Sequence, residues 1–320
     1  AAGRDLSDRA GLTLCAVMHN EMYFLPAFLE HYRALGVERF VVLDDRSDDG
    51  TAEMLDAQAD CMRLASDVRF SDKVGSGRAI YAWRRLLLDR YCTDRWAMMI
   101  DADEFVLPPP GLSMADVAQS LERRKSQSVW GIMADAYPSD RGALAASSEH
   151  PFNLQDEWFV DARRHFWIRP GRRKPIALYR GARARLMAEY GIETSRRSGF
   201  RKALGRLGGG RFLKLNQQSK VPLVRWTSGH RLDGQHRMLP PPNVADVLPM
   251  AHFKFTGDVY GKISHALGTG SYAGKSRHYV LLAKLLERME AEGASFLGPH
   301  SRPIFPVAEL YRCGLGKWTG

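Results

Sequence analysis

The stretch that decides the fold is Trp96-Ala97-Met98-Met99-Ile100-Asp101-Ala102-Asp103-Glu104-Phe105. An apolar run leads into two acids one residue apart and then a third, which predicts a buried strand that ends at a surface. Because side chains alternate along a strand, Asp101 and Asp103 are expected on one side of it. Paired carboxylates repel each other unless a cation lies between them, and Mg²⁺ favours carboxylates together with substrate phosphates. The pattern favours a divalent-metal site, with a solvated acidic turn as the alternative.

The composition is that of a folded chain of 320 residues, 45% hydrophobic and 26% charged. Such a length allows one large domain or two small ones. Cys15, Cys61, Cys92 and Cys313 form no Cys-x-x-Cys pair. This spacing argues against a metal framework, gives no reason to expect disulfides, and fits a reducing cytoplasm. No apolar run reaches the roughly 18 residues of a membrane span, and residues 1–5 do not have the pattern of a signal peptide. We therefore expect a cytoplasmic protein.

Positive charge is concentrated in the middle of the chain. The formal net charge is +10, and residues 162–225 hold eighteen Lys and Arg against two Glu. Such a field suits phosphates, nucleic acid or an anionic membrane surface, and the alternative is a merely solvated surface. Within it, Leu207-Gly208-Gly209-Gly210-Arg211 is either a lid over a bound phosphate group or a flexible connection.

The first third of the chain alternates strands and helices. The predicted strands span residues 12–18, 40–43, 61–64 and 96–100, and the predicted helices span residues 22–35, 51–59 and 75–91. This alternation is typical of a parallel sheet with crossover helices, which binds ligands at the carboxyl ends of its strands. His19, Asp44, Asp45 and Asp101 all fall at such ends, and this coincidence strengthens the metal interpretation.

Two other interpretations of the acidic motifs fit poorly. The run Asp44–Thr51 resembles a calcium loop, but Leu55 stands at the twelfth position, where an EF-hand requires Glu. An Asp-x-Asp-x-Thr phosphatase would require Thr two residues after Asp103, where Phe105 stands.

Several motifs together resemble the family-2-like glycosyltransferases. The segment Asp-Asp-Arg-Ser-Asp-Asp-Gly-Thr (44–51) is similar to that family's Asp-Asp-x-Ser-x-Asp-Gly-Thr motif, preceded by Met-His-Asn-Glu (18–21) and followed by Ile-Asp-Ala-Asp-Glu-Phe (100–105). Later segments resemble the C-terminal signatures of the branch with His-Asn-Glu on its first strand; these are Lys220–Trp226, Ser228–His230 and Ala251–Phe255. The resemblance covers roughly residues 11–280 and is strongest in the first 110.

The resemblance implies an α/β protein with the GT-A fold. This is a Rossmann-like, mostly parallel central sheet with flanking helices, here followed by a C-terminal helical segment. The implied parts are a nucleotide-sugar-binding half (11–110), an acceptor-binding half (111–260) and a C-terminal helical extension (261–320). Within that extension, the spacing of Tyr279, Leu282, Leu285 and Leu286 predicts helix from 262 to 293.

By the same resemblance, a nucleotide would meet residues from several motifs. The implied nucleotide-binding residues are His19, Asn20, Glu21, Asp44, Asp45, Arg78, Asp101 and Lys254. Acids such as Asp45 can accept hydrogen bonds from a base N–H or a ribose hydroxyl. Asp101, Asp103 and His252 would hold Mn²⁺ or Mg²⁺, which would neutralise the leaving nucleoside diphosphate. For Arg78 the alternative is a solvated arginine at a helix start.

The catalytic base is harder to place. An inverting transferase needs a carboxylate to take the proton of the acceptor hydroxyl. The candidates are Asp135, Asp156, Glu157 and Asp161, because the chain lacks the family's usual acidic pair before an Arg/Gln-x-x-Arg-Trp helix. Asp135 is favoured because it follows the strand predicted over residues 129–133. Lys220, Arg225 and His230 are candidates for contacting the acceptor or a phosphate.

The sequence therefore suggests transfer of a sugar, with inversion, from a UDP-linked donor to a carbohydrate hydroxyl, as in polysaccharide biosynthesis. The basic half would bind an anionic acceptor, or dock at the inner face of a membrane that carries a lipid-linked glycan. A nucleotidyltransferase or other phosphate-handling metal enzyme would use the same Asp101 and Asp103, but would prefer nucleoside triphosphates. A basic nucleic-acid-binding protein is disfavoured because the sequence has no recognisable nucleic-acid module.

Overall fold

The computed structural model describes residues 5–75, 77–162, 166–167, 170–171, 176–177, 181–192, 218–269 and 276–320. The strands are β1 (Leu12–Met18), β2 (Val37–Asp44), β3 (Cys61–Ala65), β4 (Lys73–Val74), β5 (Gly77–Arg78), β6 (Arg95–Met99), β7 (Glu104–Val106), β8 (Ser128–Tyr137), β9 (Phe159–Asp161), β10 (Phe166–Trp167), β11 (Ile176–Ala177), β12 (Ser219–Trp226), β13 (Arg231–Leu232), β14 (Met238–Leu239), β15 (Val247–Phe253) and β16 (Ser301–Pro303). The helices are α1 (Leu25–Ala34), α2 (Thr51–Ala57), α3 (Ala79–Tyr91), α4 (Met114–Arg123), α5 (Arg141–Ala146), α6 (Gly181–Glu189), α8 (Val259–Thr269), α9 (Arg277–Ala291) and α10 (Ala308–Arg312).

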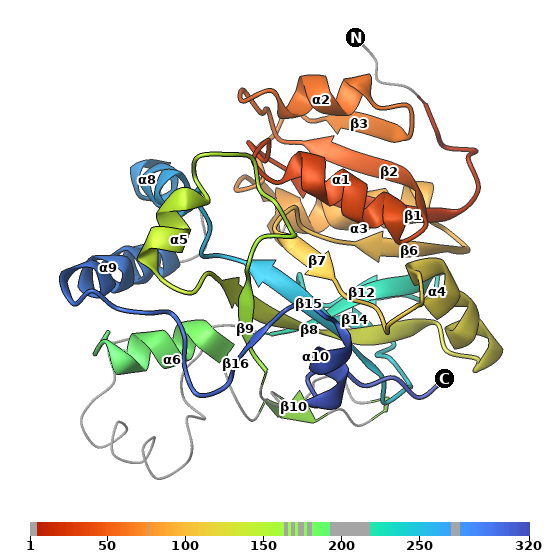
Figure 1. The fold of residues 1–320 in the computed structure, drawn as a ribbon. Helices are drawn as coiled ribbons and strands as arrows, with labels where there is room; N and C mark the ends of the chain where they lie inside the picture. Colours follow the sequence, from red (N-terminus) through yellow and green to blue (C-terminus); the bar gives the residue numbers. More distant parts are fainter. Residues whose placement is uncertain are drawn as a thin grey trace.

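A mixed sheet runs through the molecule in the order β16-β9-β8-β12-β6-β1-β2-β3, and β15 joins β7 to β8 (Figure 1). The pairs β1–β2, β2–β3, β1–β6 and β8–β15 are parallel, whereas β12 is antiparallel to both β6 and β8. Following the pairings, seven of the ten strands of this sheet, counted over the described residues, point the same way. The expected α/β, Rossmann-like architecture with a mostly parallel sheet is confirmed.

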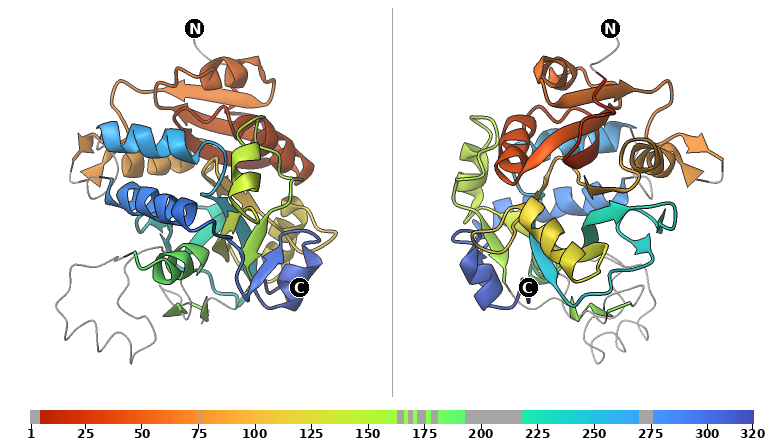
Figure 2. Two further views of the ribbon diagram at one scale, coloured as in Figure 1. Left: turned by 60° about the vertical axis from the view of Figure 1, so that its left-hand side comes forward. Right: turned by 90° about the vertical axis from the view of Figure 1, so that its right-hand side faces the viewer.

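Alternating residues of the central strands pack against helices on the two faces of the sheet. Leu14 of β1 belongs to the core that α1 covers, through its stripe of Leu25, Phe28 and Tyr32. The next residue, Cys15, belongs to the second core, which α3 covers. Figures 1 and 2 show α1 and α3 on opposite sides of the sheet. This two-layer burial is the reason that the central strands are apolar along their whole length.

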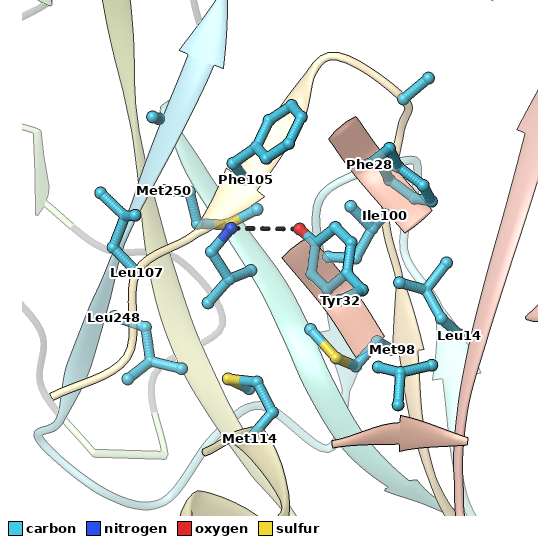
Figure 3. Packing of buried hydrophobic residues seen from close by; sticks show 14 of the residues in the cluster. Leu14, Phe28, Tyr32, Met98, Ile100, Phe105, Leu107, Met114, Leu248 and Met250 are labelled. Atoms are coloured by element: carbon cyan, nitrogen blue, oxygen red, sulfur yellow. Dashed lines mark hydrogen bonds between the residues drawn. The ribbon is translucent and has the colours of Figure 1, made fainter. Parts of the chain in front are cut away.

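Tyr32 ties α1 to the strand that follows the acidic motif. Its hydroxyl donates to the carbonyl of Glu104 (2.8 Å) and accepts from the backbone N–H of Val106 (3.1 Å). Its ring lies among Phe28, Phe105 and other buried side chains (Figure 3). A buried phenol that satisfies two backbone groups of β7 fixes that short strand beneath α1.

The last third of the chain returns to the acidic motif. β15 lies parallel to β8 and antiparallel to β7, and the N–H of Phe253 donates to the carbonyl of Asp103 (2.9 Å). The helices α8 and α9 follow and lie side by side, with α6, around their own apolar cluster (Figure 2). At the chain end, β16 pairs with β9. The strands β7, β8 and β15, which come from three separate segments of the chain, thus lie side by side next to the acidic motif.

The structure corrects several details of the sequence-based expectations. β6 ends at Met99, so Asp101 and Asp103 lie in the connection to β7 and the strand alternation that was expected to align them does not apply. The helix expected from residue 75 begins at Ala79, after the hairpin β4–β5, whose turn contains Gly75 at φ +58°. β8 continues to Tyr137, so Asp135 lies inside a strand and not at its end.

The helical pattern expected from residue 262 to 293 is divided between α8 and α9, and residues 270–275 lie outside the described residues. The glycine-rich loop 207–211 and most of the basic segment 162–225 lie outside them as well. No helix in the part of the chain that the structure describes is long and apolar enough to cross a bilayer.

Candidate functional site

The loops that follow β1 and β2 are joined into one cradle by polar side chains. Asn20 and Asp48 are linked twice: Nδ2 of Asn20 donates to Asp48 Oδ1 (2.6 Å), and the N–H of Asp48 donates to Asn20 Oδ1 (2.9 Å). The N–H of Asn20 also donates to Ser47 Oγ (2.9 Å). Asn20 adopts a positive φ of 54°, which asparagine tolerates better than most residues. Much of the two motifs therefore serves to shape these loops.

Asp45 has an unused acceptor at the centre of this cradle. His19 Nδ1 lies 2.8 Å from the backbone oxygen of Asp45, and Asp45 Oδ2 accepts the N–H of Phe70 (3.0 Å). Its other oxygen, Oδ1, is buried and has no hydrogen-bond partner among the described residues. Burial raises the pKa of Asp45 above its ordinary value. Neighbouring Asp44, by contrast, accepts the N–H of Ser47 (3.3 Å) and lies 3.9 Å from Arg63. Asp45 therefore keeps one buried acceptor oxygen unused, directly behind His19.

A cleft of about 310 Å³ separates this cradle from α8. Its walls are His19, Asn20, Glu21, Tyr23 and Asp49 on the sheet side, and Asp258, Gly261, Lys262 and His265 on the helix side. Lys262 Nζ bridges the two walls, at 2.9 Å from Glu21 and 3.1 Å from Asp258. Burial raises the pKa of Glu21 to about 7 in spite of this lysine. The cleft lies at the carboxyl ends of β1 and β2, where a sheet of this type binds ligands.

Asp101 is held by cations from two different elements. Arg84 of α3 donates to Asp101 Oδ1, and Lys220 of β12 lies 3.3 Å from Oδ2. Lys220 also donates to Glu104, which accepts the backbone N–H of Asp101 (3.0 Å). Burial opposes its charge, but Arg84 and Lys220 hold the pKa of Asp101 well below its ordinary value. Asp101 is therefore a fixed carboxylate, and its side chain remains 32% exposed.

Asp103 lies beside an ordered histidine. Nε2 of His252 is 3.9 Å from Asp103 Oδ2, and its Nδ1 is 3.0 Å from Asp135 Oδ1. The second oxygen of Asp135 accepts from Arg183 Nε (2.7 Å). A carboxylate on Nδ1 fixes the ring and directs the Nε2 lone pair outward, as is common for metal-binding histidines. Both oxygens of Asp135 are occupied, so in this arrangement it positions His252 and is poorly placed to act as a free base.

Three residues of the site were not among those assigned from the sequence. Arg84 lies on the buried face of α3 with Ile80 and Leu87, and an arginine within that apolar stripe is the sequence signal by which it could have been found. Lys262 carries no comparable signal, because its partner Glu21 is distant in sequence. His236 lies near Asp101, and burial and Lys220 lower its pKa to about 3, so its ring is neutral at pH 7.

Two assigned residues lie at the opposite end of the sheet. Because β12 is antiparallel to β6, Lys220 reaches the acidic motif, whereas Arg225 pairs with Trp96 near the start of β6. Arg225 and His230 line a separate groove of about 390 Å³. Arg225 lies 3.5 Å from Glu122, and His230 Nδ1 lies 2.9 Å from the hydroxyl of Thr227. They are not brought together with Asp101 and Asp103.

The other candidates do not line the cleft and belong to different loops and strands. Asp156 accepts from Asn153 Nδ2 (2.8 Å), and it acts electrostatically on Tyr23, a wall of the cleft. Glu157 is exposed in the same loop before β9. Arg78 lies in β5, directly before α3. Asp161 is buried and accepts from Arg185 Nε (2.9 Å), which gives it a structural partner.

The donor set suits a hard or borderline divalent cation. Asp101 and Asp103 offer carboxylate oxygens and His252 offers an outward nitrogen, a combination that fits Mn²⁺ or Mg²⁺. Within the described ranges, no three His, Cys, Asp or Glu side chains are already gathered as metal ligands. Coordination there would need the carboxylates to turn, with substrate oxygens completing the shell.

Comparisons with known proteins give no family assignment. No family model matches the sequence, and no curated protein matches it. Among solved structures, HddC from Yersinia pseudotuberculosis is 12% identical over 40% of this chain and 59% of its own, with a TM-score of 0.26. A UDP-glucose pyrophosphorylase complexed with UDP-glucose is 12% identical (52% of this chain, 68% of that chain, TM-score 0.26). A 4-diphosphocytidyl-2C-methyl-D-erythritol synthase is 12% identical (62% of this chain, 86% of that chain, TM-score 0.23). Likeness at this level carries no functional conclusion.

Proposed function

We propose that this protein is a glycosyltransferase of GT-A type, which binds a UDP-linked sugar in the cleft between the β1–β2 loops and α8. The observation that carries the proposal is the unpartnered Asp45 Oδ1 directly after β2, in a cradle built by the motif residues 18–21 and 44–51. Asp45 is 2% exposed and does not line the cleft itself, but His19, which does, contacts the backbone oxygen of Asp45, so a ligand would reach Oδ1 by displacing this wall. A buried carboxylate oxygen without a donor is costly, and a pyrimidine N–H or a ribose hydroxyl would satisfy it.

The diphosphate would lie toward the acidic motif, where the chain supplies cations. Lys262 lines the cleft and Lys254 lies beside Asp103, so both ammonium groups are within the region that the phosphates would enter. Asp101, Asp103 and His252 would hold Mn²⁺ or Mg²⁺, which supplies Lewis-acid stabilisation of the leaving diphosphate. Arg84 and Lys220 would keep Asp101 ionised and oriented.

For inverting transfer, the acceptor hydroxyl needs a carboxylate that is free to accept a proton. We place this role on the loop of Asp156 and Glu157, because Asp135 is bound on both oxygens by Arg183 and His252. The acceptor we propose is a carbohydrate, anionic or lipid-linked, and a lipid-linked acceptor implies peripheral association with a membrane.

The test is calorimetric titration with UDP, GDP and CDP, each with and without Mn²⁺. We expect Mn²⁺-dependent binding of UDP that is lost in Asp103→Asn, whereas Glu287→Gln, an exposed acid on α9, keeps it. Absence of binding by all three diphosphates in the presence of metal would refute the proposal. Better binding of UTP than of UDP or a UDP-sugar would favour a nucleotidyltransferase.

A further inference from the structure

Asp103 already has a cation in the position where a metal would be expected. Nζ of Lys254 donates to Asp103 Oδ2, the oxygen that faces His252 Nε2. Burial disfavours the charge of Lys254, but the adjacent Asp103 carboxylate raises the pKa of this lysine above its ordinary value. The same contact helps to hold the pKa of Asp103 at about 2, against the effect of burial. In this state both groups are charged and paired.

The carboxylates of the acidic motif and Asp135 are matched one to one by cationic side chains. Each carboxylate around the acidic motif contacts a cationic side chain, and the pairs are Asp101 with Arg84, Glu104 with Lys220, Asp103 with Lys254, and Asp135 with Arg183. A divalent cation that enters such a neutral cluster alone adds two unbalanced charges in a poorly solvated place, which is unfavourable. A cation that enters with a diphosphate brings its own counter-charge.

Of these cations, Lys254 is the one that can leave its carboxylate at low cost. Lys220 is only 1% exposed, and its departure would strand the buried Glu104. Arg84 is similarly enclosed at 4%. Lys254 is 25% exposed, and the backbone beside it is fixed by the hydrogen bond from Phe253 to Asp103. Only the flexible stem of the lysine has to rotate.

We propose that Lys254 is a lock on Asp103: it occupies the metal-facing oxygen in the unliganded protein and transfers to the donor's phosphate when metal and nucleotide arrive together. The inference deepens the function proposed above, since it specifies how the same site is loaded. It makes the metal and the nucleotide strongly cooperative ligands. The metal replaces Lys254 as the cation beside Asp103, and the phosphate of the nucleotide provides a new partner for the released ammonium group.

The lock has a measurable consequence for metal binding in the absence of nucleotide. Mn²⁺ alone should bind weakly to the unaltered protein, because it has to displace Lys254. Lys254→Met removes the competitor and should raise the affinity for Mn²⁺ alone by at least about tenfold, which corresponds to ~1.4 kcal/mol. The same variant should lose much of the gain in Mn²⁺ affinity that UDP produces, because no ammonium group is left to follow the phosphate.

The experiment measures free Mn²⁺ by electron paramagnetic resonance in titrations of the full chain. The matched control is Lys284→Met, which removes an exposed lysine from α9 and should leave Mn²⁺ binding unchanged. The double variant Lys254→Met/Asp103→Asn should lose the gain, which locates the metal at Asp103. Unchanged or weaker Mn²⁺ binding in folded Lys254→Met, or a gain that survives Asp103→Asn, would overturn the lock. If Lys254→Met gains Mn²⁺ affinity but no diphosphate binds, the blocking of Asp103 by Lys254 stands, whereas the transfer to phosphate and the proposed function both fail.

Discussion

Replacement of Lys220 by methionine should destabilise the protein strongly, and the structure indicates by how much. The side chain of Lys220 is 1% exposed and that of Glu104 is 2% exposed, and the two are in direct contact. Methionine fills similar volume but leaves the Glu104 carboxylate with the N–H of Asp101 as its remaining partner among the described residues. Removing one member of a buried ion pair typically costs about 3–5 kcal/mol. We expect a loss of that size in the free energy of unfolding at pH 8.

The loss should shrink as the pH falls. Burial already raises the pKa of Glu104, and without Lys220 the neutral form is favoured further. A carboxyl whose pKa is higher in the folded than in the unfolded state binds more protons when folded, so the stability of the variant decreases as the pH rises. Between the two pKa values the slope is about 1.4 kcal/mol per pH unit. Lys220→Met should therefore be closer to the unaltered protein at pH 5.5 than at pH 8.

Urea unfolding at both pH values is the assay. Lys220→Met/Glu104→Gln should recover part of the loss, because no buried charge remains, and the exposed Lys284→Met should change stability by less than about 0.5 kcal/mol. A loss below about 1 kcal/mol for Lys220→Met at pH 8, or a loss of equal size at both pH values, would refute the reasoning that Lys220 neutralises Glu104.

Three further predictions concern other parts of the structure. Tyr32→Phe should lower the free energy of unfolding by about 1–3 kcal/mol in urea titrations, because the N–H of Val106 loses its acceptor; an unchanged midpoint would contradict this role. Asp45→Asn should weaken UDP binding by about tenfold or more in calorimetry, because an NH₂ group replaces the acceptor Oδ1, while the remaining amide oxygen still accepts the N–H of Phe70 and thermal stability is kept; unchanged affinity would remove Asp45 from the nucleotide site. Since burial raises the pKa of Glu21 to about 7, the unaltered protein should lose stability relative to Glu21→Gln as the pH rises from about 5 to 8, and a constant difference across that range in urea unfolding would exclude the raised pKa.

The sequence predicted the first half of the fold well because its signals are local. The strands of residues 12–18, 37–44, 61–65 and 95–99 are short apolar runs, and the intervening helices have apolar stripes or a glycine stop. The convergence of His19, Asp45 and Asp101 at one edge follows from parallel strand order alone. Local patterns are less decisive for Asp135, because β8 stays apolar beyond the expected end and is paired on both sides.

Lys220 and Lys254 were assigned from the sequence to phosphate or nucleotide contacts, but their pairing with the acids was not predicted, and neither were Arg84 and Lys262. Arg84, Lys220 and Lys262 reach the acids from α3, β12 and α8, at separations from about 17 to 241 residues along the chain. Such pairs depend on strand order and on helix placement, which no local periodicity encodes. The antiparallel course of β12 likewise decided that Lys220 meets Asp101 while Arg225 and His230 lie in another groove.

The pairing of β15 with both β7 and β8 has a consequence for how the protein matures during synthesis. The acids of the motif are translated by residue 104, but Lys220, Lys254 and Lys262 emerge from the ribosome much later. Before these lysines are synthesised, Asp103 and Glu104 lack the cations that pair with them in the folded protein. We therefore expect the two carboxylates to stay in contact with water while the strands β1, β2 and β6 can already pair. Contacts of such long sequence separation form slowly, and domains of this size pass through intermediates. A nascent chain released before residue 254 should therefore hold the β1–β2–β6 sheet but lack a closed site, and it would be a natural substrate for chaperones.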